Sequence, residues 1–235
     1  MRRAAMIPRP LMNLIGRVSV RWRDRVLTAL TLLIVLDLFM VVPLGATHVV
    51  TVLPFSIAIV LLLVVGLLIV SQSIVPVVGV LAALVLLSSS LVLRAGGSHF
   101  TLNACLEASG WLLVGFVLIW VVAHAVFGPG RITYHRVIGA ILLYLTIGIV
   151  FVALYTLVGA LAPGSFTGIS VHDRVSLPPD LVYFSFTTIT TVGFGDIVPI
   201  HPFARSLSNL EAILGQLYPA TLLARMVSLE IGSGR

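Results

Sequence analysis

The chain has 235 residues, of which 59% are hydrophobic and only 9% are charged, and its mean hydropathy is +1.17. A soluble domain carries about 25% charged residues, so this composition excludes an ordinary soluble protein and predicts an integral membrane protein. The formal net charge is +6, and all 14 basic residues are arginine. Seven of them precede residue 26, beside the first apolar segment, which predicts contact with a membrane surface and not with nucleic acid. Cys105 is the single cysteine, which excludes an intrachain disulfide.

Residues 1–25 form a basic lead-in whose pattern has helical spacing. Arg17, Arg21 and Arg25 recur every four residues, and apolar residues recur at helical spacing among them, namely Leu11, Leu14, Ile15, Val18 and Trp22. This amphipathic pattern predicts an interfacial helix on the membrane surface, with the arginines binding anionic lipid. The alternative interpretation is a basic tail that only sets the orientation of the chain.

Apolar segments of membrane-spanning length follow, and a helix needs about 20 residues to cross the bilayer. They lie at residues 26–44, 53–71, 75–93, 104–127, 135–161 and 203–230. The stretch of 177–200, between the last two, is too short to cross the membrane and return as two full helices. Irregular backbone occurs at membrane depth only where it is buried in protein or lines a water-filled path. The sequence therefore predicts an all-α polytopic membrane protein with six transmembrane helices and one reentrant segment.

The positions of the arginines predict the orientation of the chain. An N-terminus on the cytoplasmic side places Arg131 and Arg136 on that side too, together with the seven N-terminal arginines. Arg94, Arg174 and Arg205 then lie outside. Cytoplasmic loops carry the excess of arginine, so this orientation is favoured. With six spans, both termini are predicted to be cytoplasmic.

The first four spans contain a few ionisable residues. An ionisable side chain inside a membrane normally has a partner, which predicts a network of Asp37 or Glu107 with Arg94. A structural role is favoured over an ion site for these three residues. His124, near the inner end of the fourth span, is predicted to be packed or interfacial, with pH sensing as the alternative.

The reentrant segment opens with signals for a helix start. Pro178 and Pro179 suit a first helical turn, and Asp180 complements the positive end of a helix. The helix is predicted to run to about Thr190. The chain then reads Thr191-Val192-Gly193-Phe194-Gly195-Asp196, in which the two glycines reach positive φ angles without steric cost. Such unusual backbone angles allow successive carbonyl groups to point toward one axis and to replace the water shell of a cation.

The sequence T-V-G-F-G at residues 191–195 resembles the signature of the potassium channel superfamily, in which it forms the ion-selectivity filter. The resemblance covers about residues 135–230, and it extends to the first four spans only in layout. It implies a homotetramer, because one copy provides a quarter of the filter ring. It also implies K⁺ ions bound by a filter made of Thr191, Val192, Gly193, Phe194 and Gly195. No organic cofactor is expected.

Residues around the filter are predicted to support it. Tyr183 stands where many members of the superfamily have an aromatic donor to the Asp after the filter, so the resemblance implies a Tyr183–Asp196 hydrogen bond. Simple aromatic packing of Tyr183 is the alternative. Some bacterial members have a pore-helix carboxylate that pairs with this Asp, and Thr187 stands at that position here. Phe194 replaces the commoner tyrosine. The other predicted support residues are Thr188, Thr190 and Glu211.

The last span carries the candidate gating residues. Gly215 matches the glycine hinge position of the superfamily's inner helix, and Pro219 removes a helical hydrogen bond and can bend the helix. Close packing at a helix crossing is the alternative explanation of Gly215. Helical spacing predicts that Gln216, Pro219 and Leu223 line the cavity.

Glu211 is the one carboxylate in the middle of this span. A carboxylate inside a membrane is costly and faces protein or water. We expect it to accept hydrogen bonds from pore-helix hydroxyls such as Thr187 or Thr188. The alternative is that it faces the cavity and attracts cations.

The layout divides the chain into the lead-in at 1–25, a four-span module at 26–130 and a pore domain at 131–235. Steep voltage gating needs about 3–4 charges per subunit that move through the membrane field. The fourth span, 104–127, contains no arginine. The four-span module is therefore predicted not to sense voltage. No cytosolic nucleotide- or calcium-sensing domain is expected after Arg225.

The resulting hypothesis is a K⁺-selective channel that conducts passively, with no catalytic residues, in a prokaryotic plasma membrane. The alternative within this class is a poorly selective cation channel. The alternatives from other classes are a secondary transporter and a non-conducting membrane interaction protein. Transporters of this kind have paired repeats with broken helices in both halves, whereas a single reentrant segment is predicted here.

Overall fold

The computed structural model describes residues 25–46, 61, 64, 74–95, 100–127, 134–169 and 179–233. The basic lead-in at 1–24 and most of the predicted span at 53–71 lie outside the described residues, so both remain predictions. The side chain of Arg94 also lies outside them, which leaves its predicted network with Asp37 or Glu107 untested.

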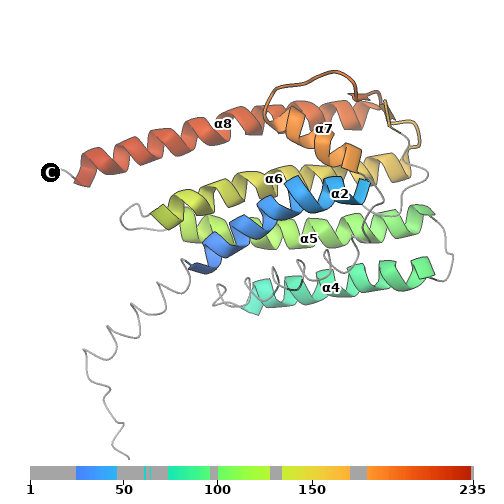
Figure 1. The fold of residues 1–235 in the computed structure, drawn as a ribbon, viewed down its shortest axis with the longest axis horizontal. Helices are drawn as coiled ribbons and strands as arrows, with labels where there is room; N and C mark the ends of the chain where they lie inside the picture. The colour runs from blue at the N-terminus through green and yellow to red at the C-terminus, as the bar shows by residue number, and fades with distance from the viewer. Residues whose placement is uncertain are drawn as a thin grey trace, which may run out of the picture.

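The described part of the chain is mainly helical. Residues 25–36 are helical and continue into a π-helical turn, η1 (Asp37–Val41), and then into α2 (Val42–Ala46). The longer helices are α4 (Ile74–Ala95), α5 (Phe100–Phe127), α6 (Tyr134–Leu161) and α8 (Pro202–Ser233). Figure 1 shows them roughly side by side, with the C-terminal end of α4, the N-terminal end of α5, the C-terminal end of α6 and the N-terminal end of α8 at the same end of the bundle.

Four helices in the described part are long and apolar enough to cross a membrane: Arg25–Leu44, Val75–Leu93, Phe100–His124 and Arg136–Leu161. They coincide with four of the six predicted spans. The sixth predicted span is present as the helix α8, which is 32 residues long but is not apolar enough to belong to this group. The described part is that of a multi-pass membrane protein.

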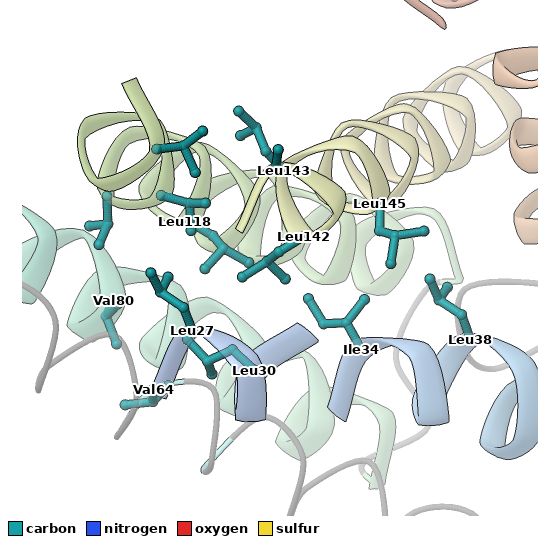
Figure 2. Packing of buried hydrophobic residues seen from close by; sticks show 14 residues of the cluster. Leu27, Leu30, Ile34, Leu38, Val64, Val80, Leu118, Leu142, Leu143 and Leu145 are labelled. Carbon is teal, nitrogen blue, oxygen red and sulfur yellow. The ribbon is translucent and has the colours of Figure 1, made fainter. Parts of the chain in front are cut away.

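The core of the bundle lies between the first helix and α4, α5 and α6. Figure 2 shows Leu27, Leu30, Ile34 and Leu38 on one face of the first helix, at helical spacing, pointing toward Leu142 and Leu145 of α6. All of them are buried. The opposite faces of these helices carry exposed large apolar side chains, as expected for a surface that contacts lipid.

Two small elements and one short helix complete the fold. The helix α7 (Pro179–Ile189) packs against α6 and α8, and it also contacts α2. It begins and ends within one residue of the predicted positions. The strands β1 (Phe166–Thr167) and β2 (Val198–Pro199) pair antiparallel, with Phe166 opposite Pro199. No strand was predicted from the sequence.

The contact between α5 and α6 depends on a glycine and gives a test of the fold. A Cβ at Gly115 would overlap the Cγ2 atom of Val150 on α6. We expect Gly115→Leu to lower the free energy of unfolding by about 1–3 kcal/mol, because the larger side chain overpacks this contact. Thermal unfolding in detergent measures the change. The adjacent control Phe116→Leu lies at a position that is 57% exposed and should change stability far less.

Candidate functional site

The helix α7 is held by a cluster of aromatic rings. Tyr155 of α6, Phe166 of β1 and Phe184 of α7 form three ring contacts with centroid distances of 5.0–5.7 Å. Leu181, Ser185 and Ile189 of α7 are buried at intervals of four residues, so one face of this helix packs on the protein. The short helix is thereby fixed in both position and rotation.

The loop that follows α7, residues 190–196, is anchored to the end of the helix through its backbone. The N–H groups of Val192 and Gly193 both donate to the Thr187 carbonyl oxygen, at 2.9 and 3.1 Å, and Thr191 N–H donates to the Thr188 carbonyl oxygen at 2.9 Å. The N–H groups of residues 191–193 thus point back toward α7. Among the described residues, no backbone N–H reaches the carbonyl oxygens of 191–195.

Positive φ angles fall on every second residue of the loop. They are +59° at Thr191, +53° at Gly193 and +79° at Gly195. In a planar trans peptide the carbonyl group is antiparallel to the N–H group of the next residue, so the carbonyl groups of Thr190, Thr191 and Val192 point away from the carbonyl oxygens of Thr187 and Thr188. Thr191 is a β-branched residue in the left-handed region, which costs about 1–3 kcal/mol and is typical of functional sites. This unusual backbone conformation makes the loop the candidate functional site.

The outer part of the loop faces away from the single chain. Val192 is 55% exposed and Phe194 is 70% exposed. The Phe194 ring stacks on Tyr183 of α7, with centroids 6.1 Å apart and an interplanar angle of 5°. The predicted Tyr183–Asp196 hydrogen bond stays a prediction, whereas the aromatic packing of Tyr183, which was its alternative, is present in this ring stack. Asp196 Oδ1 accepts the Ile197 N–H at 3.0 Å.

The inner part of the loop contacts α8. Gln216 Nε2 donates to Thr191 Oγ1 at 2.8 Å, a contact that was not predicted. Gln216 is exposed on the single chain, as are Pro219 and Leu223, which were also predicted to line a cavity.

Gly215 lies directly against the end of α7. A Cβ at Gly215 would overlap the carbonyl oxygen of Ile189. The same carbonyl oxygen accepts the hydroxyl of Tyr144 of α6 at 3.1 Å. The structure thus gives Gly215 a packing role, which was the alternative to a hinge. Pro219 lies inside α8, where it lacks the N–H that would bond to the Gly215 carbonyl, and the predicted hinge stays a prediction.

Glu211 has different partners from those predicted. Its side chain is completely buried, with Oε1 at 2.5 Å from Ser185 Oγ and Oε2 at 2.6 Å from the Tyr155 hydroxyl. The predicted type of partner, a hydroxyl group of α7, is present, but it belongs to Ser185 and not to Thr187 or Thr188. The alternative of an open, cavity-facing carboxylate is wrong in this structure.

The threonines of α7 bond within their own helix. The hydroxyls of Thr187 and Thr188 donate to the Phe184 carbonyl oxygen at 3.0 and 2.8 Å, and that of Thr190 donates to the Phe186 carbonyl oxygen at 2.6 Å. Their side chains therefore do not reach Glu211. Thr187 supports the loop through its backbone carbonyl, which is a role that side-chain reasoning missed.

The strands β1 and β2 connect the segment after α6 to the segment after the loop. The N–H groups of Ile200 and His201 donate to the Ser165 carbonyl oxygen at 2.8 and 3.2 Å. A Cβ at Gly168 would overlap the Asp196 carbonyl oxygen. The chain just after α6 is thus packed against the outer end of the 190–196 loop.

Comparisons with known proteins find similarity to ion channels in the same part of the chain. Residues 140–230 match a protein family described as "Ion channel". Protein LctB of Bacillus caldotenax is 33% identical over 87 residues, which are 36% of this chain and 64% of that protein. The inward rectifier potassium channel Kirbac3.1 of Paramagnetospirillum magnetotacticum is 32% identical over 130 residues, which are 54% of this chain and 37% of that protein.

A third relative is Protein LctB of Geobacillus stearothermophilus, which is 35% identical over 66 residues, or 28% of this chain and 46% of that protein. The chain covers less than two thirds of the length of each of these three relatives. No solved structure matches the chain. The segment that is similar to ion channels contains the 190–196 loop, α7 and most of α6 and α8.

Two glycines near β1 test the contact with the loop. Gly164 and Gly168 have φ angles of +81° and +85°, but only Gly168 faces a backbone atom, the Asp196 carbonyl oxygen. Gly164→Ala should lower the free energy of unfolding by about 1–2 kcal/mol through backbone strain alone. Gly168→Ala should cost clearly more, because strain and overlap add. Thermal unfolding in detergent compares them, and equal losses would contradict the contact.

Gly215 gives a second test at the other end of the loop. Gly215→Ala should displace the end of α7, because its methyl group would overlap the Ile189 carbonyl oxygen. We expect a loss of about 1–3 kcal/mol in stability, as for other overpacked contacts. Ala220→Ser is the control, since it adds one atom at an exposed position of the same helix. A stabilised Gly215→Ala protein would refute the contact, because alanine favours a helix when nothing obstructs it.

Proposed function

We propose that the chain is a K⁺-selective channel of the potassium channel superfamily, in which residues 191–195 form the selectivity filter. The family match and the inward rectifier potassium channel relative support a channel of this superfamily. The observation that carries the finer proposal is the alternation of φ angles at Thr191, Gly193 and Gly195. With the N–H groups bound to α7, the carbonyl oxygens of the loop are available to coordinate a dehydrated cation. The Thr191 hydroxyl adds an oxygen at the inner end.

The proposed assembly is a homotetramer. One loop offers oxygens on one side only, whereas a K⁺ ion must be surrounded, and a closed ring of four identical loops achieves this. The exposure of Val192 and Phe194 in the single chain supports the assembly, because these apolar side chains then become buried between neighbouring copies. The exposed apolar side chains of α8, such as Ile213 and Leu217, are covered in the same way.

The composition of α8 supports its proposed place as the inner helix. It is long enough to cross a membrane, yet it is less apolar than the four other spans. A helix that lines a water-filled cavity has polar residues on the cavity side, and Gln216 is an exposed polar residue of α8 that contacts Thr191. In the proposed channel, the cavity lies below Thr191 and is lined by Gln216, Pro219 and Leu223.

The proposed orientation has both termini in the cytoplasm, with the Asp196 end of the filter outside. The arginine distribution supports this orientation. The helix α5 contains no arginine, so we propose that the channel is not gated by voltage in the standard way. The proposed setting is a prokaryotic plasma membrane, with anionic lipids at the N-terminal arginines.

The filter assignment can be tested with two glycines of nearly equal conformation. Gly195 and Gly164 have φ angles of +79° and +81°, and a Cβ at either position meets nothing within 4 Å. We expect Gly195→Ala to abolish K⁺ flux from proteoliposomes, because the carbonyl row is disturbed, while Gly164→Ala conducts. Both proteins carry a similar strain, so stability alone cannot explain the difference.

The same proteoliposomes test selectivity. Wild-type flux should be large in a K⁺ gradient and small in a Na⁺ gradient, because the carbonyl ring replaces the water shell of K⁺ better. Equal fluxes of the two ions would favour a poorly selective cation channel. The absence of flux for both ions, with intact tetramers, would favour a transporter or an interaction protein instead.

A further inference from the structure

The buried Glu211 is part of a continuous chain of hydrogen bonds among three helices. Its Oε1 lies 2.5 Å from Ser185 Oγ of α7, and its Oε2 lies 2.6 Å from the Tyr155 hydroxyl of α6. Ser185 Oγ also lies 2.9 Å from the Gly148 carbonyl oxygen of α6. The chain thus joins α8 to α7 and both of these helices to α6.

A count of protons decides how this chain is arranged. The Gly148 carbonyl has no proton, so the Ser185 hydroxyl must donate to it. Ser185 has a single hydroxyl proton, so toward Glu211 its oxygen acts as the acceptor. The proton between Ser185 and Glu211 therefore belongs to Glu211. If Glu211 were ionised, only the hydroxyl protons of Ser185 and Tyr155 would be available for the three contacts. One contact would then bring two buried oxygen atoms together without a proton between them, which is unfavourable.

The surroundings of Glu211 also favour the neutral acid. The titratable groups that face it are Tyr155 and Tyr144, both of α6. The helix α7 contributes the Ser185 hydroxyl. In the part of the chain that the structure describes, no basic side chain is paired with Glu211. A buried carboxylate without a counter-charge is strongly disfavoured.

We propose that Glu211 functions as a neutral carboxylic acid whose proton is a structural part of the contact that positions α7 behind the filter. Glu211 donates to Ser185, Ser185 donates to Gly148, and Tyr155 donates to Glu211. Because α7 carries the filter through the Thr187 carbonyl, this proton positions the filter as well. The functional consequence rests on the proposed channel activity, whereas the protonation state does not.

The proposal gives a direction for the effect of pH. Removal of the proton from Glu211 leaves Ser185 with two acceptors and one proton, so the link from α7 to either α6 or α8 is lost. K⁺ flux should therefore fall as the pH rises. Gln at position 211 has an N–H donor for Ser185 and a carbonyl oxygen for Tyr155, and it has no proton to lose. Glu211→Gln should thus conduct without the alkaline decline, while Glu211→Ala should lower both flux and thermal stability.

The experiment has one readout that does not depend on conduction. Infrared spectra of the purified wild-type protein in lipid should contain the C=O band of a protonated carboxyl group, and this band should be missing from Glu211→Gln. Ser185→Ala should shift the band, because it removes the acceptor. Ser165→Ala is the matched control, since Ser165 is a buried serine that donates to the Ala162 carbonyl oxygen, and it should leave the band in place.

The outcomes separate this proposal from the proposed function. A wild-type spectrum without a band assignable to Glu211 would overturn the neutral acid, whatever the flux. The neutral acid would also be overturned if Glu211→Gln retained the full alkaline decline of K⁺ flux. If the band is assigned to Glu211 but no variant conducts any ion, the protonation state is supported and the channel function fails.

Discussion

The Thr187 carbonyl holds the 190–196 loop against the end of α7. It accepts the N–H groups of both Val192 and Gly193, and because each peptide is planar, the carbonyl groups of Thr191 and Val192 point to the opposite side. The orientation of those oxygens is therefore only as well defined as the position of the end of α7. The ring cluster around Phe184 and the hydrogen bonds of Ser185 fix that position.

Much of the site could be predicted because its signals are local in the sequence. Pro179 and Asp180 mark the start of α7, and the glycines at 193 and 195 mark the positions with positive φ. The position of Glu211 inside a membrane span predicted a hydroxyl partner. The identity of that partner depended on how α7 is rotated about its axis. Ser185 lies on the buried face of α7 together with residues 181 and 189, whereas the neighbouring threonines lie off this face and bond to carbonyl groups of their own helix.

The features that were not predicted depend on contacts between segments that are distant in the sequence, and such contacts have no local sequence signal. The pairing of β1 with β2 joins residues about 30 positions apart, and strands of two residues are too short to show an alternating pattern. The hydrogen bond from Gln216 to Thr191 and the contact of Gly215 with Ile189 likewise depend on how α8 packs against α7. A glycine in a helix is compatible with bending, which was the favoured prediction for Gly215, and with close packing, and only the structure identifies its neighbour.

The position of Gly215 has a mechanical consequence. Its carbonyl has no helical donor at Pro219, so α8 is intrinsically weakest at the residue where it touches the carbonyl of Ile189. A bend of α8 at this point cannot occur without a change in that contact. Displacement of the far half of the helix would therefore be transmitted to the end of α7 directly, through two backbones and without any relay of side chains. Bending of such a helix and rearrangement of the 190–196 loop would be a single, coupled motion.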